Sequence, residues 1–353
     1  GLSLSTTLNN PLLKPEFTKE IEFGTDLGFF DSRVNGSVTY YKSNTTNQTL
    51  AISTSPATGY SNTLVNVGEV ENTGLETKLD IQVLTKAQNG VGLDLAGNFT
   101  IQNSKVVSLT NGLKSITLGG FTNAAVSAVV GQPYPVLLGT DVNRDPQGHV
   151  IVDAVSGNPS LNSNLTNLGR TTPKYLLGLT QTLSYKFISL AVTSEFRTGN
   201  VIYNQGLIQA TAAGASALSA SSGRLPFVFP NSVIQTSPGV YVKNTNTTTA
   251  SGDINFFDAG AFYSAASTYV TSGAFWKIRE ADLNFDLTSF VKHSKFIKRA
   301  SFSLIGRNLF MFRPKSNNWS DPEFASTTGN AVGFETNQLP PTRLFGANLN
   351  VTF

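Results

Sequence analysis

Apolar and polar residues alternate along most of this chain. Residues 75–83 read LETKLDIQV, which places Leu, Thr, Leu, Ile and Val on one side and Glu, Lys, Asp and Gln on the other. The last nine residues, 345–353, read FGANLNVTF and repeat the pattern. Because successive side chains of a strand point to opposite faces of a sheet, this period of two predicts β-strands with one apolar and one polar face.

The same alternation recurs in nine segments, each about as long as a tilted strand that crosses a membrane. The predicted strands cover residues 16–29, 33–46, 72–84, 91–104, 173–184, 187–198, 276–288, 298–310 and 342–353. Helical patterns are few. The Ala- and Ser-rich run 210–222 is compatible with a short helix or with a low-complexity loop.

The connections between these segments alternate between short and long. The short ones are residues 30–32, 85–90, 184–186 and 289–297, and the long ones are residues 47–71, 105–172, 199–275 and 311–341. An outer-membrane β-barrel has this arrangement, with short periplasmic turns and long extracellular loops. We therefore expect an all-β, membrane-spanning antiparallel barrel wall. A soluble sheet also alternates, so a secreted or surface β-rich adhesin is the competing interpretation.

Composition narrows the class further. Charged residues make up 13% of the 353 residues and hydrophobic residues 40%, which argues against a helical membrane bundle, a coiled coil and a charged disordered tail. The net charge of +3 is too small for a nucleic-acid partner. The one dense basic run, residues 292–299, is interpreted as a solvated turn.

Catalytic chemistry finds little support. The chain has no cysteine and two histidines, His149 and His293, so a metal cluster of the Cys/His type cannot be assembled. It contains no nucleophile elbow and no Gly-rich phosphate loop. Carboxylates such as Asp26 and Asp80 occupy the polar face of predicted strands, where a polar barrel lumen explains them. We expect no enzymatic activity.

One segment suggests calcium. Asp141, Asn143 and Asp145 alternate as oxygen ligands do in calcium loops, and Asp153 follows as a fourth candidate. The pattern departs from such loops at Pro146, where a glycine would be expected. The alternative is an Asx-rich turn.

Four aromatic residues fall in or beside the long connections: Tyr60, Tyr134, Tyr203 and Trp319. They are candidates for stacking on a sugar substrate or for contacting a partner. Aromatic residues in loops also pack loops against one another, and this is the preferred interpretation.

Ordered blocks of sequence then point to a family. They are NPLLKPE (10–16), GFFDSRVNGSVTYY (28–41), TGYSNTLVNVGEVENTGLE (58–76), VGQPY (130–134), DVNRDPQG (141–148), GRNLF (306–310), DPE (321–323) and PPTR (340–343). In this order and spacing, the chain resembles the C-terminal barrel portion of SusC/RagA-like TonB-dependent outer-membrane transporters.

The resemblance implies a 22-strand barrel with an N-terminal plug, covered by a SusD-like surface lipoprotein, which imports oligosaccharides or peptides with energy from TonB. Residues 1–353 would form the C-terminal part of that barrel, without the plug and the first strands. Other strands, from the same protein or another chain, would complete the wall in the lipid. A transporter-like barrel that serves as a scaffold in an outer-membrane assembly is the alternative.

A separate prediction concerns the position and role of the final residue, Phe353. The alternation places Phe353 on the apolar face at the periplasmic rim, where aromatic girdles lie. The resemblance implies that Phe353 is also the signal recognised by the barrel-assembly machinery.

Overall fold

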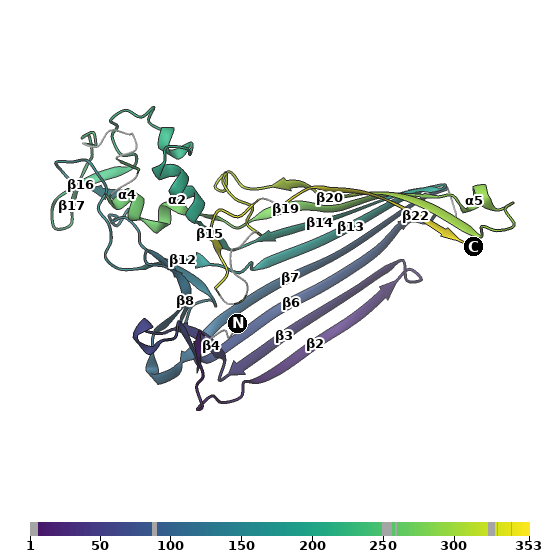
Figure 1. Ribbon diagram of the computed structural model, residues 1–353, viewed down its shortest axis with the longest axis horizontal. Coiled ribbons are helices and arrows are strands. Elements are labelled where there is room, and N and C mark those ends of the chain that lie inside the picture. Colours follow the sequence, from purple (N-terminus) through teal and green to yellow (C-terminus); the bar gives the residue numbers. More distant parts are fainter. Residues whose placement is uncertain are drawn as a thin grey trace.

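A single curved sheet dominates the computed structural model, which describes residues 6–86, 90–248, 256–257, 260–323, 329, 331–339 and 341–353. Nine antiparallel strands of the described residues follow one another in chain order (Figure 1). They are β2 (Phe17–Phe29), β3 (Val34–Thr46), β6 (Gly68–Leu84), β7 (Val91–Leu109), β13 (Tyr175–Tyr185), β14 (Ile188–Thr198), β19 (Phe275–Asp286), β20 (Arg299–Phe312) and β22 (Leu344–Thr352). We call this sheet the wall. All nine predicted membrane strands are confirmed.

Two strands are longer than the alternation indicated. β6 begins at Gly68 rather than at residue 72, and β7 ends at Leu109 rather than at residue 104. The added residues pair with one another, from Gly68 opposite Leu109 to Glu71 opposite Lys105. Val70 and Val106 are buried there in a core made with loop residues, so these ends follow a different polarity pattern from the wall.

The pairing register aligns the apolar positions into one continuous face. Phe99 lies opposite Thr77 on one side and Leu177 on the other. Phe285 likewise lies between Ile188 and Phe302. Side chains of this face remain open to the surroundings across the whole wall, with Phe23 70%, Leu304 46% and Phe345 78% exposed. A face of this kind requires an apolar solvent.

The two outer strands have one neighbour each within the described residues. β2 pairs with β3 alone and β22 with β20 alone. Every residue of both strands is exposed. The wall is therefore an open sheet in this chain.

The two ends of the wall differ. Turns at residues 30–33, 186–187 and 287–298, with residues 85, 86 and 90, lie at one end, which holds the short helix α5 (Thr288–Val291) and the C-terminus (Figure 1). The described residues of the connections 47–67, 110–174, 199–274 and 313–343 gather at the other end, and together with Thr7–Leu8 we call them the loop layer. The predicted alternation of short and long connections is confirmed.

The loop layer contains small sheets that the alternation did not predict. Their strands are β1 (Thr7–Leu8), β4 (Thr49–Ser53) and β5 (Asn62–Asn66); β8 (Ser115–Phe121), β9 (Ala124–Val129), β10 (Val136–Gly139) and β12 (Thr166–Arg170); β11 (Val150–Val152), β16 (Ser232–Ser237) and β17 (Val240–Lys243); β15 (Val201–Asn204), β18 (Val270–Ser272) and β21 (Phe334–Glu335). Its helices are α2 (Gln205–Ala212) and α4 (Gly260–Ser264). The run 210–222 is thus mainly a loop that follows the end of α2, with one 3-10 turn at Leu218–Ala220.

Buried apolar cores lie at this end of the molecule. Leu137, Tyr203 and Tyr269 are fully buried in one cluster, and Leu50 and Val67 in a second. Among the described residues, no helix is long and apolar enough to cross a membrane.

Candidate functional site

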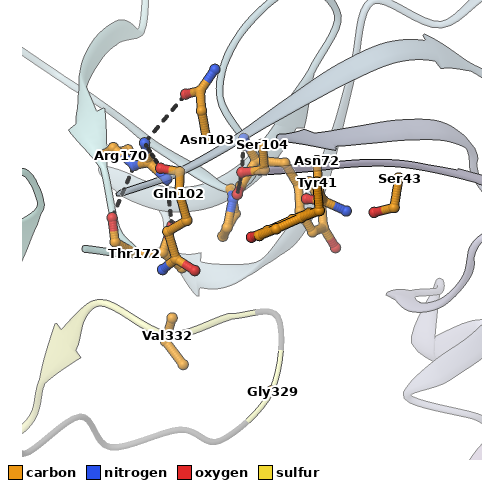
Figure 2. A pocket seen from close by; sticks show the side chains of 12 residues that line it. Tyr41, Ser43, Asn72, Gln102, Asn103, Ser104, Arg170, Thr172, Gly329 and Val332 are labelled. Atoms are coloured by element: carbon orange, nitrogen blue, oxygen red, sulfur yellow. Dashed lines mark hydrogen bonds between the residues drawn. The ribbon is translucent and has the colours of Figure 1, made fainter. Parts of the chain in front are cut away.

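A polar pocket opens on the polar face of the wall, where β3, β6 and β7 meet the loop layer. Its cavity volume is about 380 Å³. The lining residues are mostly amides and hydroxyls: Tyr41, Ser43, Asn72, Gln102, Asn103, Ser104, Tyr134, Pro135, Arg170, Thr172, Gly329 and Val332. Figure 2 shows Gly329 and Val332 on a separate segment, opposite the strand residues. The pocket therefore lies between the wall and the connection 313–343.

A glycine makes room for the aromatic side of the pocket. Tyr41 lies opposite Gly74 in the register of β3 and β6. A Cβ atom at Gly74 would overlap the Tyr41 ring, so the ring can lie flat across β6 only over a residue without a side chain. Figure 2 shows Tyr41 beside Asn72 and Ser104 on this face.

Arg170 is the one cationic residue among the described residues that line the pocket. Its Nε donates to the carbonyl of Thr172 at 2.9 Å and its Nη2 to the Thr172 hydroxyl at 3.3 Å. Its Nη1 donates to the Gln102 carbonyl at 3.3 Å and to Asn103 Oδ1 at 3.4 Å. Burial lowers the pKa of this guanidinium from its ordinary value, and the preceding Gly169, with φ +134°, permits the turn that presents it.

Tyr134 joins the pocket to the loop core. Its backbone N–H donates to the Ser104 hydroxyl at 3.2 Å, and the same hydroxyl donates to the Tyr134 carbonyl at 2.5 Å. Its ring is nine-tenths buried, and burial raises the pKa of its hydroxyl. That hydroxyl has no hydrogen-bond partner among the described residues.

A charge network anchors the connection 313–343 to the wall. Three cations and three anions take part: Arg197, Lys277 and Arg279 with Glu195, Asp321 and Glu323. The first four belong to β14 and β19, and the last two to the DPE segment of the connection. The network is electrically balanced and links two strands to one loop.

Lys277 is the centre of this network. Its Nζ lies 2.7 Å from both Asp321 Oδ2 and Glu323 Oε2, and its side chain is only 6% exposed. The Phe275 ring lies 4.9 Å from the same Nζ. A buried cation of this kind is stable because carboxylates and an aromatic face surround it.

Glu323 receives a second set of donors from Arg279. Nη1 and Nη2 of Arg279 lie 2.6 and 2.5 Å from the two carboxylate oxygens of Glu323, a bidentate pair. Burial by itself raises the pKa of the Glu323 carboxyl, but hydrogen bonds from Arg279 and Lys277 outweigh it and lower the pKa to about 2. Glu323 is therefore ionised at neutral pH.

The calcium candidates occupy hydrogen-bonded turns. Asp145 accepts bonds from the backbone N–H groups of Gln147 and His149 at 3.0 and 2.7 Å, and its second oxygen lies 2.7 Å from His149 Nδ1. Asp153 accepts from the N–H groups of residues 155 and 156.

Asp141 and Asn143 are engaged as well. Asp141 Oδ1 accepts from Ser267 Oγ at 2.5 Å, and Asn143 donates to Ser160 at 3.0 Å. Within the described residues, no three His, Asp or Glu side chains come close enough to hold a metal ion. The geometry is that of Asx turns, and the calcium site stays a prediction.

The four candidate aromatic residues do not form one surface. Tyr203 is fully buried, donates its hydroxyl to Asn123 Oδ1 at 3.3 Å and packs edge-on against Phe334. Trp319 is exposed and donates Nε1 to Glu335 at 3.3 Å. Tyr60 belongs to the connection between β4 and β5. Of the four, only Tyr134 is among the described residues that line the pocket.

Phe353 follows the last residue of β22 and is 75% exposed. It lies at the end with the short turns (Figure 1), the position expected from the alternation. Its role as an assembly signal stays a prediction.

The sequence did not single out Arg170 or the charge network as sites. Glu195 and Lys277 lie opposite each other in register, which could be predicted only once the strand pairing is known. Arg170 sits in a loop strand whose pattern carries no alternation signal. The one available clue was the DPE block, which supplies Asp321 and Glu323.

Comparison with known proteins shows which proteins resemble this chain. A family model described as TonB dependent receptor-like, beta-barrel matches residues 2–274. The TonB-dependent receptor P3 of Formosa agariphila is 21% identical over 376 residues, which cover 99% of this chain and 35% of that protein. The TonB-dependent receptor P26 of the same organism is 24% identical over 393 residues, with 100% and 36% covered.

A solved structure shares the fold. The RagAB peptide importer in its closed-closed state superimposes with a TM-score of 0.70 at 18% identity, over 98% of this chain and 36% of that one. This chain spans about a third of the length of the relatives it matches.

Proposed function

The chain belongs to the TonB-dependent receptor-like β-barrel family, an outer-membrane family of transporters rather than enzymes, and we propose that it forms the C-terminal wall of a barrel that imports nutrient oligomers. The observation that carries this proposal is the wall itself. Over most of its length one face of the nine strands exposes large apolar side chains, and the other face carries the polar pocket and the charge network. This is the polarity of a lipid-facing barrel with a hydrated lumen.

Further strands complete the barrel in this proposal. The outer edges of β2 and β22 have no partner among the described residues. Unpaired backbone N–H and C=O groups are not tolerated in the hydrocarbon core of a bilayer. The missing strands and the plug come from the same protein or from another chain, and TonB acts through that missing part.

A surface lipoprotein of the SusD type covers the loop layer in this proposal. The loop layer has its own buried cores and small sheets, so it can present a defined docking surface. The cargo is a peptide or an oligosaccharide. A peptide is supported by the shared fold with an importer of peptides, and both cargoes suit a pocket of amides and hydroxyls.

Uptake of labelled oligomers by cells tests the proposal. Cells with the intact gene, a deletion and a complemented deletion are offered fluorescent oligopeptides and oligosaccharides of matched size. We expect uptake of one class to be lost in the deletion, restored by complementation and abolished when a protonophore removes the energy source of TonB.

The alternatives give different results. Surface binding without uptake would overturn import and favour an adhesin. Unchanged uptake with a loss of envelope integrity in the deletion would overturn import and favour a scaffold.

A further inference from the structure

We propose that the polar pocket is a carboxylate-binding subsite in which Arg170 receives an anionic group of the transported oligomer. This inference deepens the proposed transport function. It rests on that function for the assumption that the ligand is a transported oligomer, whereas the binding of a carboxylate by Arg170 can be tested without transport. The argument depends on how Arg170 is held, on the charges around it and on the groups beside it.

The guanidinium is held in place by neutral groups. A guanidinium carries five N–H donors, and four contacts, to Thr172, Gln102 and Asn103, engage Arg170. Three of these four are long, at 3.3–3.4 Å. The side chain is therefore fixed in one orientation while its charge is only weakly satisfied.

The charge of Arg170 is not balanced locally. Among the described residues that line the pocket, none is acidic, and no described carboxylate forms an ion pair with Arg170. The contrast with the nearby charge network is direct, since each cation there faces at least one carboxylate. A half-buried arginine without an anion is unfavourable, and a bound anion would relieve this penalty.

The rest of the pocket suits a polar chain that carries such an anion. Asn72 and Gln102 offer amide donors and acceptors on the wall side, and Ser43 offers a hydroxyl (Figure 2). One N–H of the Arg170 guanidinium is not engaged by these contacts and can donate a charge-assisted hydrogen bond to a carboxylate. The carboxylate would anchor the ligand, and the amides would contact its polar backbone.

A carboxylate of this kind has two sources, a peptide C-terminus or an acidic sugar. The test measures binding to the purified, complete protein by calorimetry. The first pair of probes is one N-acetylated hexapeptide with a free C-terminal carboxylate or with a C-terminal amide. The second pair is trigalacturonate and its methyl ester.

For the source that the protein uses, we expect the carboxylate form to bind about tenfold more tightly than its neutral form. Arg170→Gln should abolish this difference, and Arg170→Lys should retain part of it because the charge remains. Arg224 is an exposed arginine that also donates to a carbonyl, that of Gly214 at 2.9 Å. Arg224→Gln therefore controls for net charge and should keep the full preference.

Three outcomes would overturn the subsite: equal binding of both members in both pairs, a preference that survives in Arg170→Gln, or an equal loss in Arg224→Gln. Circular dichroism of each variant verifies folding, and the Arg170→Lys result stands if Arg170→Gln does not fold. Import is measured separately. If the protein prefers the carboxylate probe but cells take up no oligomer, only the transport function is contradicted. If cells take up oligomers but the protein shows no preference for the carboxylate probe, only the subsite is contradicted.

Discussion

The wall and the loop layer are made from one chain but are stabilised in opposite ways. In the wall, large apolar side chains such as Phe23 and Phe345 are 70% and 78% exposed. In the loop layer, Val126, Leu137 and Tyr203 are completely buried. The wall needs an apolar solvent and pairs its backbone from strand to strand, whereas the loop layer excludes water from cores of its own.

This difference determines where ions can be buried. Charged pairs on the wall alone, such as Arg307 with Glu280, remain 57% and 38% exposed. Lys277 and Asp321 are 6% and 4% exposed because the connection 313–343 covers them. The pocket and the charge network both lie where the wall meets the connection 313–343, so both sites combine a strand face with residues of this connection.

Loss of the Lys277 cation should have the largest effect on the contact between the wall and the connection 313–343. Lys277→Met leaves Asp321 without its cation, and we expect docking of residues 313–323 to weaken by about 4 kcal/mol, the loss typical of a broken buried pair. Hydrogen exchange of that segment measures it. Arg307→Met removes an exposed ion pair between β20 and β19 and should change stability by less than about 1 kcal/mol. Equal effects of the two variants would contradict the role of burial.

Truncation of one leucine in the wall and one in the loop layer compares how the two regions are stabilised. Leu137→Ala opens a cavity in the loop core and should destabilise the loop layer by about 3 kcal/mol. Leu79→Ala, on the 46% exposed apolar face, should cost about 0.5 kcal/mol, because lipid fills the space. Thermal unfolding in detergent and hydrogen exchange of β10 measure both. A larger loss for Leu79→Ala would show that the wall has a packed partner on that face.

A cation on the apolar face tests the orientation of the wall. We expect Leu79→Arg to destabilise the inserted protein by about 2 kcal/mol, measured as the midpoint of urea unfolding in lipid vesicles. The adjacent Lys78 already carries a cation on the polar face, where it pairs with Asp80 at 2.8 Å. Lys78→Arg is the matched control and should unfold like the unaltered protein. Normal stability of Leu79→Arg would reverse the assignment of the two faces.

Acid should weaken the contact between the wall and the connection 313–343 by a smaller amount through protonation of Glu323. The pKa of Glu323 is lowered from 4.5 to about 2. Its contribution to docking is therefore complete above pH 4.5 and declines as the pH falls towards 2. Pepsin cleavage within residues 313–323 should increase over that interval, and Glu323→Gln should remove this pH dependence. Cleavage that begins near neutral pH would exclude Glu323 as its cause.

Deletion of Phe353 should have the smallest effect on stability. The ring is 75% exposed, so we expect a loss below about 1 kcal/mol. The amount of protein inserted in the outer membrane should nevertheless fall several-fold, because recognition by the assembly machinery is proposed to require this residue. Quantitative blotting of membrane fractions and heat stability of the inserted protein separate the two effects. Normal insertion would leave Phe353 a packing residue.

The sequence by itself determined the wall. Alternation over about ten residues is a local property, so nine strands, their two faces and the alternation of short and long connections could be predicted without tertiary information. The same alternation failed at the loop-side ends of β6 and β7, where Val70 and Val106 are buried between the sheet and the loops. There the polarity of a position depends on which loop covers it.

Only the tertiary structure decided the sites. Lys277 and Asp321 are 44 residues apart in the chain, and Arg170 contacts a strand 67 residues earlier. Their side chains meet because strand register and loop docking bring them together, and neither has a periodic signature. A strand pattern follows from which face each residue takes, whereas a pocket or a buried ion network follows from which distant residues share that face.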